Sequence, residues 1–197
     1  MNAQTDEERR FGQLAGAAAI LSGAAWVTWA VLNATYAGQI DTYPPVVDAR
    51  LYKAGALLTV GWNLLLIPAV VALWQWLREK RTSLLLLYSV CGGLSLCFWA
   101  YGGATHGITP ALETTYLWLS AVWWTGIGFE LRSEAKALGY FTMVLGLFAL
   151  LDGLFSFLEP MPAAIYALAA PKLPLALGWS FWMGAKLMTR SEERTAS

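Results

Sequence analysis

The segment LYKAGALLTVGWNLLLIPAVVALWQWL, residues 51 to 77, decides the fold class of this chain. It is predominantly apolar over its whole length, and a membrane-spanning helix needs about 20 such residues to cross the hydrocarbon core. It lacks the alternation of apolar and polar residues that is typical of a membrane β-barrel strand. We therefore predict a transmembrane α-helix for this segment.

Five further apolar stretches of similar length flank this segment. Because lipid admits only helices or closed barrels as spanning structures, we predict an all-α, polytopic membrane helical bundle with six transmembrane helices. Residues 11–189 are predicted to form this single domain, with polar tails at 1–10 and 190–197. The six predicted spans are Phe11–Tyr36, Leu51–Leu77, Thr82–Ala104, Leu112–Leu131, Ala137–Leu158 and Ala163–Met188.

The last predicted span contains two prolines, Pro171 and Pro174. Proline removes a backbone donor and clashes with the preceding turn of a helix. Either the sixth span is broken at this point, or its helix begins near Leu173.

Lysine and arginine are unevenly distributed over the predicted connections, and this indicates an orientation. The connections after the third and fifth spans contain neither residue, and the one after the first span has only Arg50 and Lys53. Because cytoplasmic loops carry an excess of Lys and Arg, both termini are predicted to be cytoplasmic, in the cell (inner or plasma) membrane. The basic residues assigned to the cytoplasmic side are Arg9, Arg10, Arg78, Lys80, Arg81, Arg132, Lys136, Lys186, Arg190 and Arg194.

Composition restricts the partners. Charged residues make up 13% of the chain and the formal net charge is zero, so no basic surface for nucleic acid is predicted. The expected partners are the lipid bilayer, a larger membrane complex or a second copy of the chain, and a hydrophobic small molecule.

Eleven tryptophans are many for a chain of 197 residues. Some are predicted to lie in belts at the membrane surface, but a larger group falls deeper in the spans. The deeper group could line a pocket for a flat, apolar or cationic ligand such as a quinone, pigment, isoprenoid or quaternary amine, or it could pack against lipid and other helices. Its members are Trp26, Trp62, Trp99, Trp118, Trp123, Trp124 and Trp179.

Asp152 and Lys172 are the most unusual charged residues, because both fall within predicted spans that are joined by a short turn. A charge in the membrane is costly and is by default paired or directed at a cavity. The short turn makes an ion pair between them geometrically feasible, while a Lys172 freed by the proline break could instead extend outward to the membrane surface. An ion pair would belong either to a proton or ligand site, or to a structural contact that fixes the register of the last two spans.

Two further polar residues are candidates for a ligand site, one in the outer half of the bundle and one at its centre. Glu113 begins the fourth span, and Asn63 lies at mid-membrane near Pro68, where it could bond a freed backbone carbonyl or a neighbouring helix. His106 is the only histidine, which argues against a bis-histidine haem and a multi-histidine metal site. No metal ligands are therefore predicted, and no cofactor is indicated.

Short patterns near the start and in the second half of the chain resemble those of a known family. They are RFGQLAG (10–16), FELRS (129–133), ALGYF (137–141) and GWSFWMGAK (178–186). They are similar to a bacterial domain-of-unknown-function family of six-span integral membrane proteins. The resemblance implies the fold and a membrane location, and the family has no established activity or catalytic residues to carry over.

Three classes of function remain open. We predict first a non-catalytic membrane protein, either an accessory subunit or a binder of a small hydrophobic ligand with an outward-facing aromatic pocket. A membrane-embedded enzyme acting on a lipid or isoprenoid, with Asp152 or Glu113 as general acid, is the alternative, as is a small transporter. The residues predicted to line a ligand site are Asp152, Lys172, Glu113, Trp99, Trp118 and Asn63.

Overall fold

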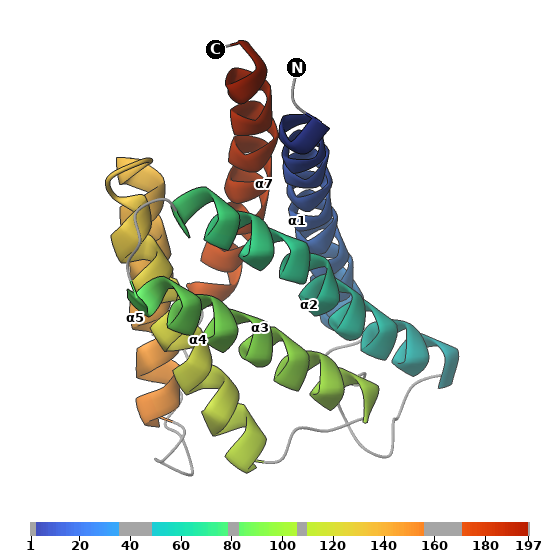
Figure 1. Ribbon diagram of the computed structural model, residues 1–197. Helices are drawn as coiled ribbons and strands as arrows, with labels where there is room; N and C mark the ends of the chain where they lie inside the picture. Colours follow the sequence, from blue (N-terminus) through green and yellow to red (C-terminus); the bar gives the residue numbers. More distant parts are fainter. Residues whose placement is uncertain (1–2, 36–48, 79–82, 106–109, 156–170, 197) are drawn as a thin grey trace.

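The computed structural model describes residues 3–35, 49–78, 83–105, 110–155 and 171–196, and these residues form six α-helices. The chain reverses direction between successive helices (Figure 1). The helices are α1 (Ala3–Thr35), α2 (Ala49–Leu77), α3 (Ser83–Ala104), α4 (Pro110–Leu131), α5 (Lys136–Phe155) and α7 (Lys172–Ala196).

The six helices form a closed ring. Each helix packs against its neighbour in the chain, and α7 completes the ring by packing against both α1 and α5. The contact of α7 with α1 is extensive, whereas that with α5 is much smaller. Both chain ends lie at the same end of the bundle (Figure 1). We call this the terminal end, and the other the distal end.

Four helices contain segments that are long and apolar enough to cross a membrane: Asp6–Leu32, Lys53–Leu77, Leu84–Ala104 and Lys136–Phe155. This supports the prediction of a helical membrane protein. Among the described residues, α4 and α7 do not meet the same criterion; both are rich in tryptophan, and α7 also carries many charges in its last turns.

Both outer helices extend beyond their predicted limits. Residues 3–10, predicted as a polar tail, are the start of α1, and α7 continues to Ala196. The extension of α1 is explained by its contacts, because Glu8 accepts a hydrogen bond of 3.0 Å from Arg78 at the end of α2. Helix α7 begins at Lys172, as one of the two alternatives for the last span predicts, with Pro174 in the first turn, where proline is tolerated. Residues 163–170 lie outside the described residues.

Glycines allow the closest helix contacts. A Cβ added at Gly16 of α1 would lie 2.5 Å from the carbonyl oxygen of Gly184 in α7, and one at Gly184 would lie 2.6 Å from that of Gly16. In the same way, Gly128 of α4 faces Gly139 of α5, where an added Cβ would lie 2.8 Å from the partner's carbonyl oxygen. Small residues at such positions allow two helix backbones to touch, as in other membrane bundles.

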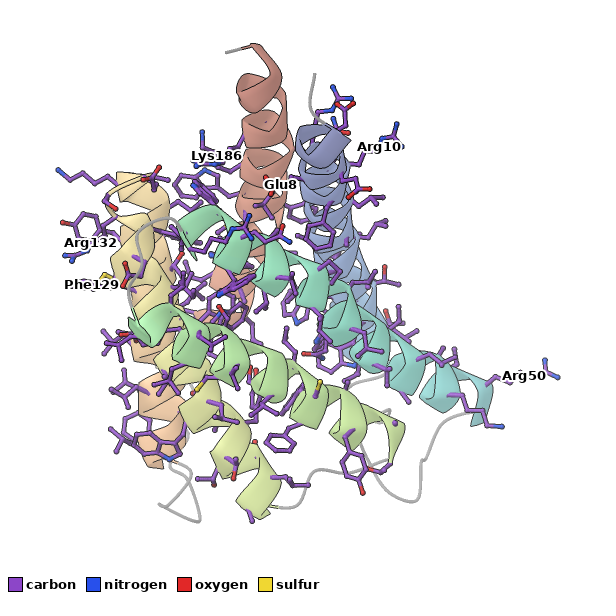
Figure 2. The ribbon with its side chains drawn as sticks, in the orientation of Figure 1. Glu8, Arg10, Arg50, Phe129, Arg132 and Lys186 are labelled. Atoms are coloured by element: carbon purple, nitrogen blue, oxygen red, sulfur yellow. The ribbon has the colours of Figure 1, made fainter. Side chains whose placement is uncertain are left out.

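The sealed part of the core lies toward the terminal end. Its largest fully buried side chains come from the second halves of α2 and α4, the first half of α5 and the middle of α7. They include Leu73, Leu77, Ile127, Leu131, Leu138, Trp179 and Met183. Basic residues from separate helices gather around this end, and Figure 2 shows Arg10 and Lys186 near it, with Arg50 at the distal end.

Candidate functional site

A cavity of about 1000 Å³ lies inside the ring, and all six helices contribute to its wall. It is surrounded by the second halves of α1, α3 and α5, the middle of α2, and the first halves of α4 and α7. It therefore occupies the distal half of the bundle, below the sealed core. Its volume is at the upper end of the range of about 300–1,000 Å³ for small-molecule sites. The tryptophans in its wall are Trp26, Trp29, Trp62, Trp99, Trp123 and Trp124.

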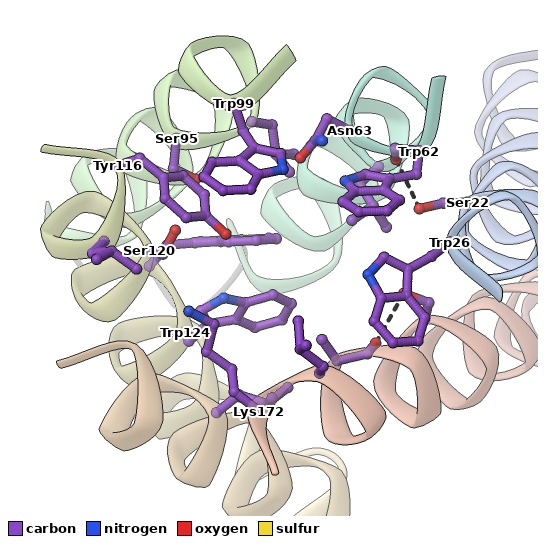
Figure 3. A pocket seen from close by; sticks show the side chains of 18 of the residues that line it. Ser22, Trp26, Trp62, Asn63, Ser95, Trp99, Tyr116, Ser120, Trp124 and Lys172 are labelled. Atoms are coloured by element: carbon purple, nitrogen blue, oxygen red, sulfur yellow. Dashed lines mark hydrogen bonds between the residues drawn. The ribbon is translucent and has the colours of Figure 1, made fainter. Parts of the chain in front are cut away.

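The aromatic side chains of the wall contact one another across helix boundaries. Trp62 of α2 meets Trp29 of α1 edge to face, with ring centroids 5.2 Å apart, and Trp26 lies 6.1 Å from the same ring. On the opposite side, Trp99 of α3 stacks on Tyr116 of α4 at 4.6 Å. Figure 3 shows Trp26, Trp62, Trp99 and Tyr116 arranged around a common space. The wall therefore offers extended aromatic surface that is held by neighbouring rings.

Several polar side chains of the wall are bonded to backbone carbonyls. The hydroxyl of Ser22 in α1 donates to the carbonyl of Trp62 in α2 at 2.7 Å, which ties these two helices together. Ser95 and Ser180 donate within their own helices, at 2.8 and 3.0 Å. Such bonds satisfy the hydroxyl protons, as buried polar groups require.

Asn63 projects into the cavity wall and is only 3% exposed. Its Nδ2 donates to the carbonyl of Thr59, one turn earlier in α2, at 2.8 Å. The alternative in which Asn63 bonds a carbonyl freed by Pro68 is not the one observed. Because Pro68 has no N–H, the carbonyl of Leu64 loses its helical donor, and Leu64 follows Asn63 in the chain, whereas the Asn63 amide points back to Thr59. Its Oδ1 has no hydrogen-bond partner among the described residues.

The ion pair between Asp152 and Lys172 forms at the distal end of the cavity. Lys172, the first residue of α7, donates to the Oδ2 of Asp152 in α5, and each side chain is 17% exposed. The ammonium also lies 6.0 Å from the ring centroid of Tyr116. The pair joins α5 to α7, the two neighbouring helices of the ring that pack least extensively, so it helps to hold the ring closed beside the cavity.

Five of the six residues predicted to line a ligand site lie in the cavity wall: Asp152, Lys172, Glu113, Trp99 and Asn63. The sixth, Trp118, does not. It is 37% exposed on the outer side of α4, and its indole lies near Gly153 of α5. The cause is the rotation of α4, whose hydrophobicity is nearly uniform around its circumference, so the sequence does not reveal which face turns inward.

The sequence prediction of the site omitted several wall residues, above all Trp26, Trp29 and Trp62. Trp26 and Trp62 were in the group of deep tryptophans that could line a pocket. Depth alone, however, does not distinguish a side chain that faces the cavity from one that faces lipid. Trp179 was in the same deep group, and it is instead sealed in the core, where its indole Nε1 donates to Thr142 at 2.9 Å.

Among the described residues, which leave out His106, no three His, Cys, Asp or Glu side chains lie close enough to hold a metal ion. Comparisons with known proteins returned no matching family model, no matching curated protein and no matching solved structure. The resemblance to a six-span family therefore stays a prediction, and the function must be argued from the cavity.

Proposed function

We propose that this chain is a six-span integral membrane protein that binds a hydrophobic small molecule in its central cavity, without catalysing a reaction. The observation that carries the proposal is the cavity of about 1000 Å³, which all six helices border and six tryptophans line. Ligand sites are concave and mostly apolar, with a few convergent polar groups, and this wall has that composition.

Helices α4 and α7 are part of the proposed membrane domain although their composition is less apolar. Their outward-facing side chains support this, because they include large apolar groups such as Val122 and Phe129 on α4 and Phe181 and Trp182 on α7. Apolar side chains on an outer surface require lipid or another apolar partner. If only the other four helices lay in lipid, the apolar outer faces of α4 and α7 would be exposed to water.

The terminal end is proposed to be cytoplasmic, in the cell membrane. The support is the excess of Lys and Arg in the tails and in the connections at that end. Single cysteines placed at Thr42 and at Ser197, in a background with Cys91 and Cys97 replaced by serine, test this. In intact cells, a thiol reagent that does not cross membranes should label only the cysteine at position 42. Labelling at position 197 alone would contradict the proposed orientation and place the terminal end outside the cell.

A non-catalytic role is favoured over the enzyme alternative by the state of the candidate acids. The carboxylate of Asp152 is already engaged as the acceptor of an ion pair with Lys172. Glu113 lines the cavity but is exposed, in the first turn of α4.

Mass spectrometry of the protein extracted with its native lipids is the direct test. We expect a small apolar molecule to co-purify in stoichiometric amount. Ala176→Trp, which would fill the cavity from α7, should abolish its retention, whereas Val122→Trp on the outer face of α4 should not. Equal retention by both variants would contradict the proposal, and a stoichiometric protein partner without a small molecule would make the chain an accessory subunit.

A further inference from the structure

The tryptophans of the cavity differ from the sealed tryptophan in the state of their indole N–H groups. Trp179 donates its hydrogen bond to Thr142. Trp26, Trp29, Trp62, Trp99 and Trp124 donate none within the described part of the chain. The indole nitrogens of Trp76 and Trp123 are buried and also lack a hydrogen-bond partner. Those of the five cavity tryptophans are not buried in this way.

The free donors are directed into the cavity. Figure 3 shows the indole nitrogens of Trp26 and Trp62 on the ring edges that face the common space, and the hydroxyl of Tyr116 reaching into it from the other side. Trp62 is the most enclosed of the three, at 9% exposure. These N–H groups are accessible from the cavity and have no partner among the described residues, so a ligand that supplies an acceptor there would gain a hydrogen bond.

The cavity carries little charge with which to hold an ion. The ammonium of Lys172 is already paired with Asp152, and the hydroxyls of the wall are neutral. The remaining formal charge is that of Glu113, which is exposed at the distal end. An anionic ligand would lie among donors but without a free counter-charge, and charge that is buried without a partner is strongly unfavourable.

From these observations we infer that the ligand is a neutral, flat ring that bears carbonyl oxygens, as in the quinone class. The inference rests on the proposed function and specifies its ligand. The oxygens accept hydrogen bonds from the indoles of Trp26 and Trp62, and the ring lies against the aromatic faces of the wall. The volume left beyond such a ring accommodates an apolar tail.

The test compares two probes of the same shape: menadione, a methylated naphthoquinone, and methylnaphthalene, its carbon skeleton without oxygens. Isothermal titration of the purified full chain in detergent, with empty micelles as the blank, gives both affinities. We expect menadione to bind at least several-fold more tightly. Trp62→Phe keeps the aromatic face and removes the N–H, so it should weaken menadione roughly three- to tenfold and leave methylnaphthalene unchanged.

Trp118→Phe is the matched control, because Trp118 lies outside the cavity wall, and it should change neither affinity. Trp26→Phe repeats the test if Trp62→Phe does not fold. Equal affinities for the two probes, or a loss of methylnaphthalene binding equal to that of menadione in both variants, would overturn the inference and leave the proposed function standing. Absence of saturable binding for both probes would overturn the proposed function itself.

Discussion

The two halves of the bundle use the same residue types in different ways. Toward the terminal end, Trp179 is fully buried, bonded to Thr142 and packed edge to face on Trp124, with ring centroids 4.5 Å apart. Toward the distal end, Trp62 keeps its ring against Trp26 and Trp29 but leaves its N–H free in a cavity. Trp179, whose N–H has a partner inside the protein, therefore stabilises the fold, whereas the N–H of Trp62 remains available to a ligand.

The largest expected effect concerns the ion pair that closes the distal half. Lys172→Met leaves the carboxylate of Asp152 without its partner, and breaking a buried pair in this way costs about 3 kcal/mol of unfolding free energy. The double variant Asp152→Asn/Lys172→Met should recover most of the loss, because no charge is then left unpaired. Thermal unfolding in detergent, followed by circular dichroism, measures both.

The corresponding control lies at the terminal end. Glu8→Gln removes the partner of Arg78 in a pair whose side chains are 44% and 32% exposed, so the loss should stay below about 1 kcal/mol. If Glu8→Gln costs as much as Lys172→Met, the distal pair has no special role in closing the ring. If the double variant stays as unstable as Lys172→Met, the pair is not structural.

A smaller effect distinguishes two adjacent glycines of α3. A Cβ at Gly92 would lie 2.7 Å from the indole of Trp123, whereas one at Gly93 would meet nothing within 4 Å. Because Trp123 is only 1% exposed and cannot move freely, Gly92→Ala should destabilise the protein by about 2 kcal/mol through overpacking. Gly93→Ala should leave the unfolding temperature unchanged or slightly raised, since alanine is the better helix former. Equal melting temperatures would show that Trp123 can shift toward the cavity.

The smallest effect tests the comparison of tryptophans directly. Trp179→Phe removes the hydrogen bond to Thr142 and leaves a void, with an expected loss of about 1.5 kcal/mol. Trp62→Phe removes an N–H that has no partner, so its cost should be below about 0.5 kcal/mol. Chemical denaturation of the two variants under identical conditions decides the order. Equal losses would mean that the N–H of Trp62 is satisfied by bound lipid or water in the free protein.

Much of the helical architecture was predictable because it depends on local composition. The apolar runs around residues 51–77, 82–104 and 137–155 correspond to helices within a few residues of their predicted limits. Residues 3–10 and 190–196, predicted as polar tails, are helical, and ion pairs such as Glu8 with Arg78 and Arg190 with Glu134 join these ends to neighbouring parts of the bundle. Composition alone treats such residues as solvated tails.

The ion pair of Asp152 with Lys172 was also predictable from the sequence, because two charges in adjacent apolar segments must be paired to be tolerated. The sequence by itself determined the all-α class, the run of apolar helices and this pair, since each follows from the cost of placing backbone or charge in an apolar medium. Only the tertiary structure decided which tryptophans face the cavity, because α3 and α4 are apolar on every side. In the folded chain Gly92 of α3 faces Trp123 of α4, and Gly128 of α4 faces Gly139 of α5, close contacts that no local pattern reveals.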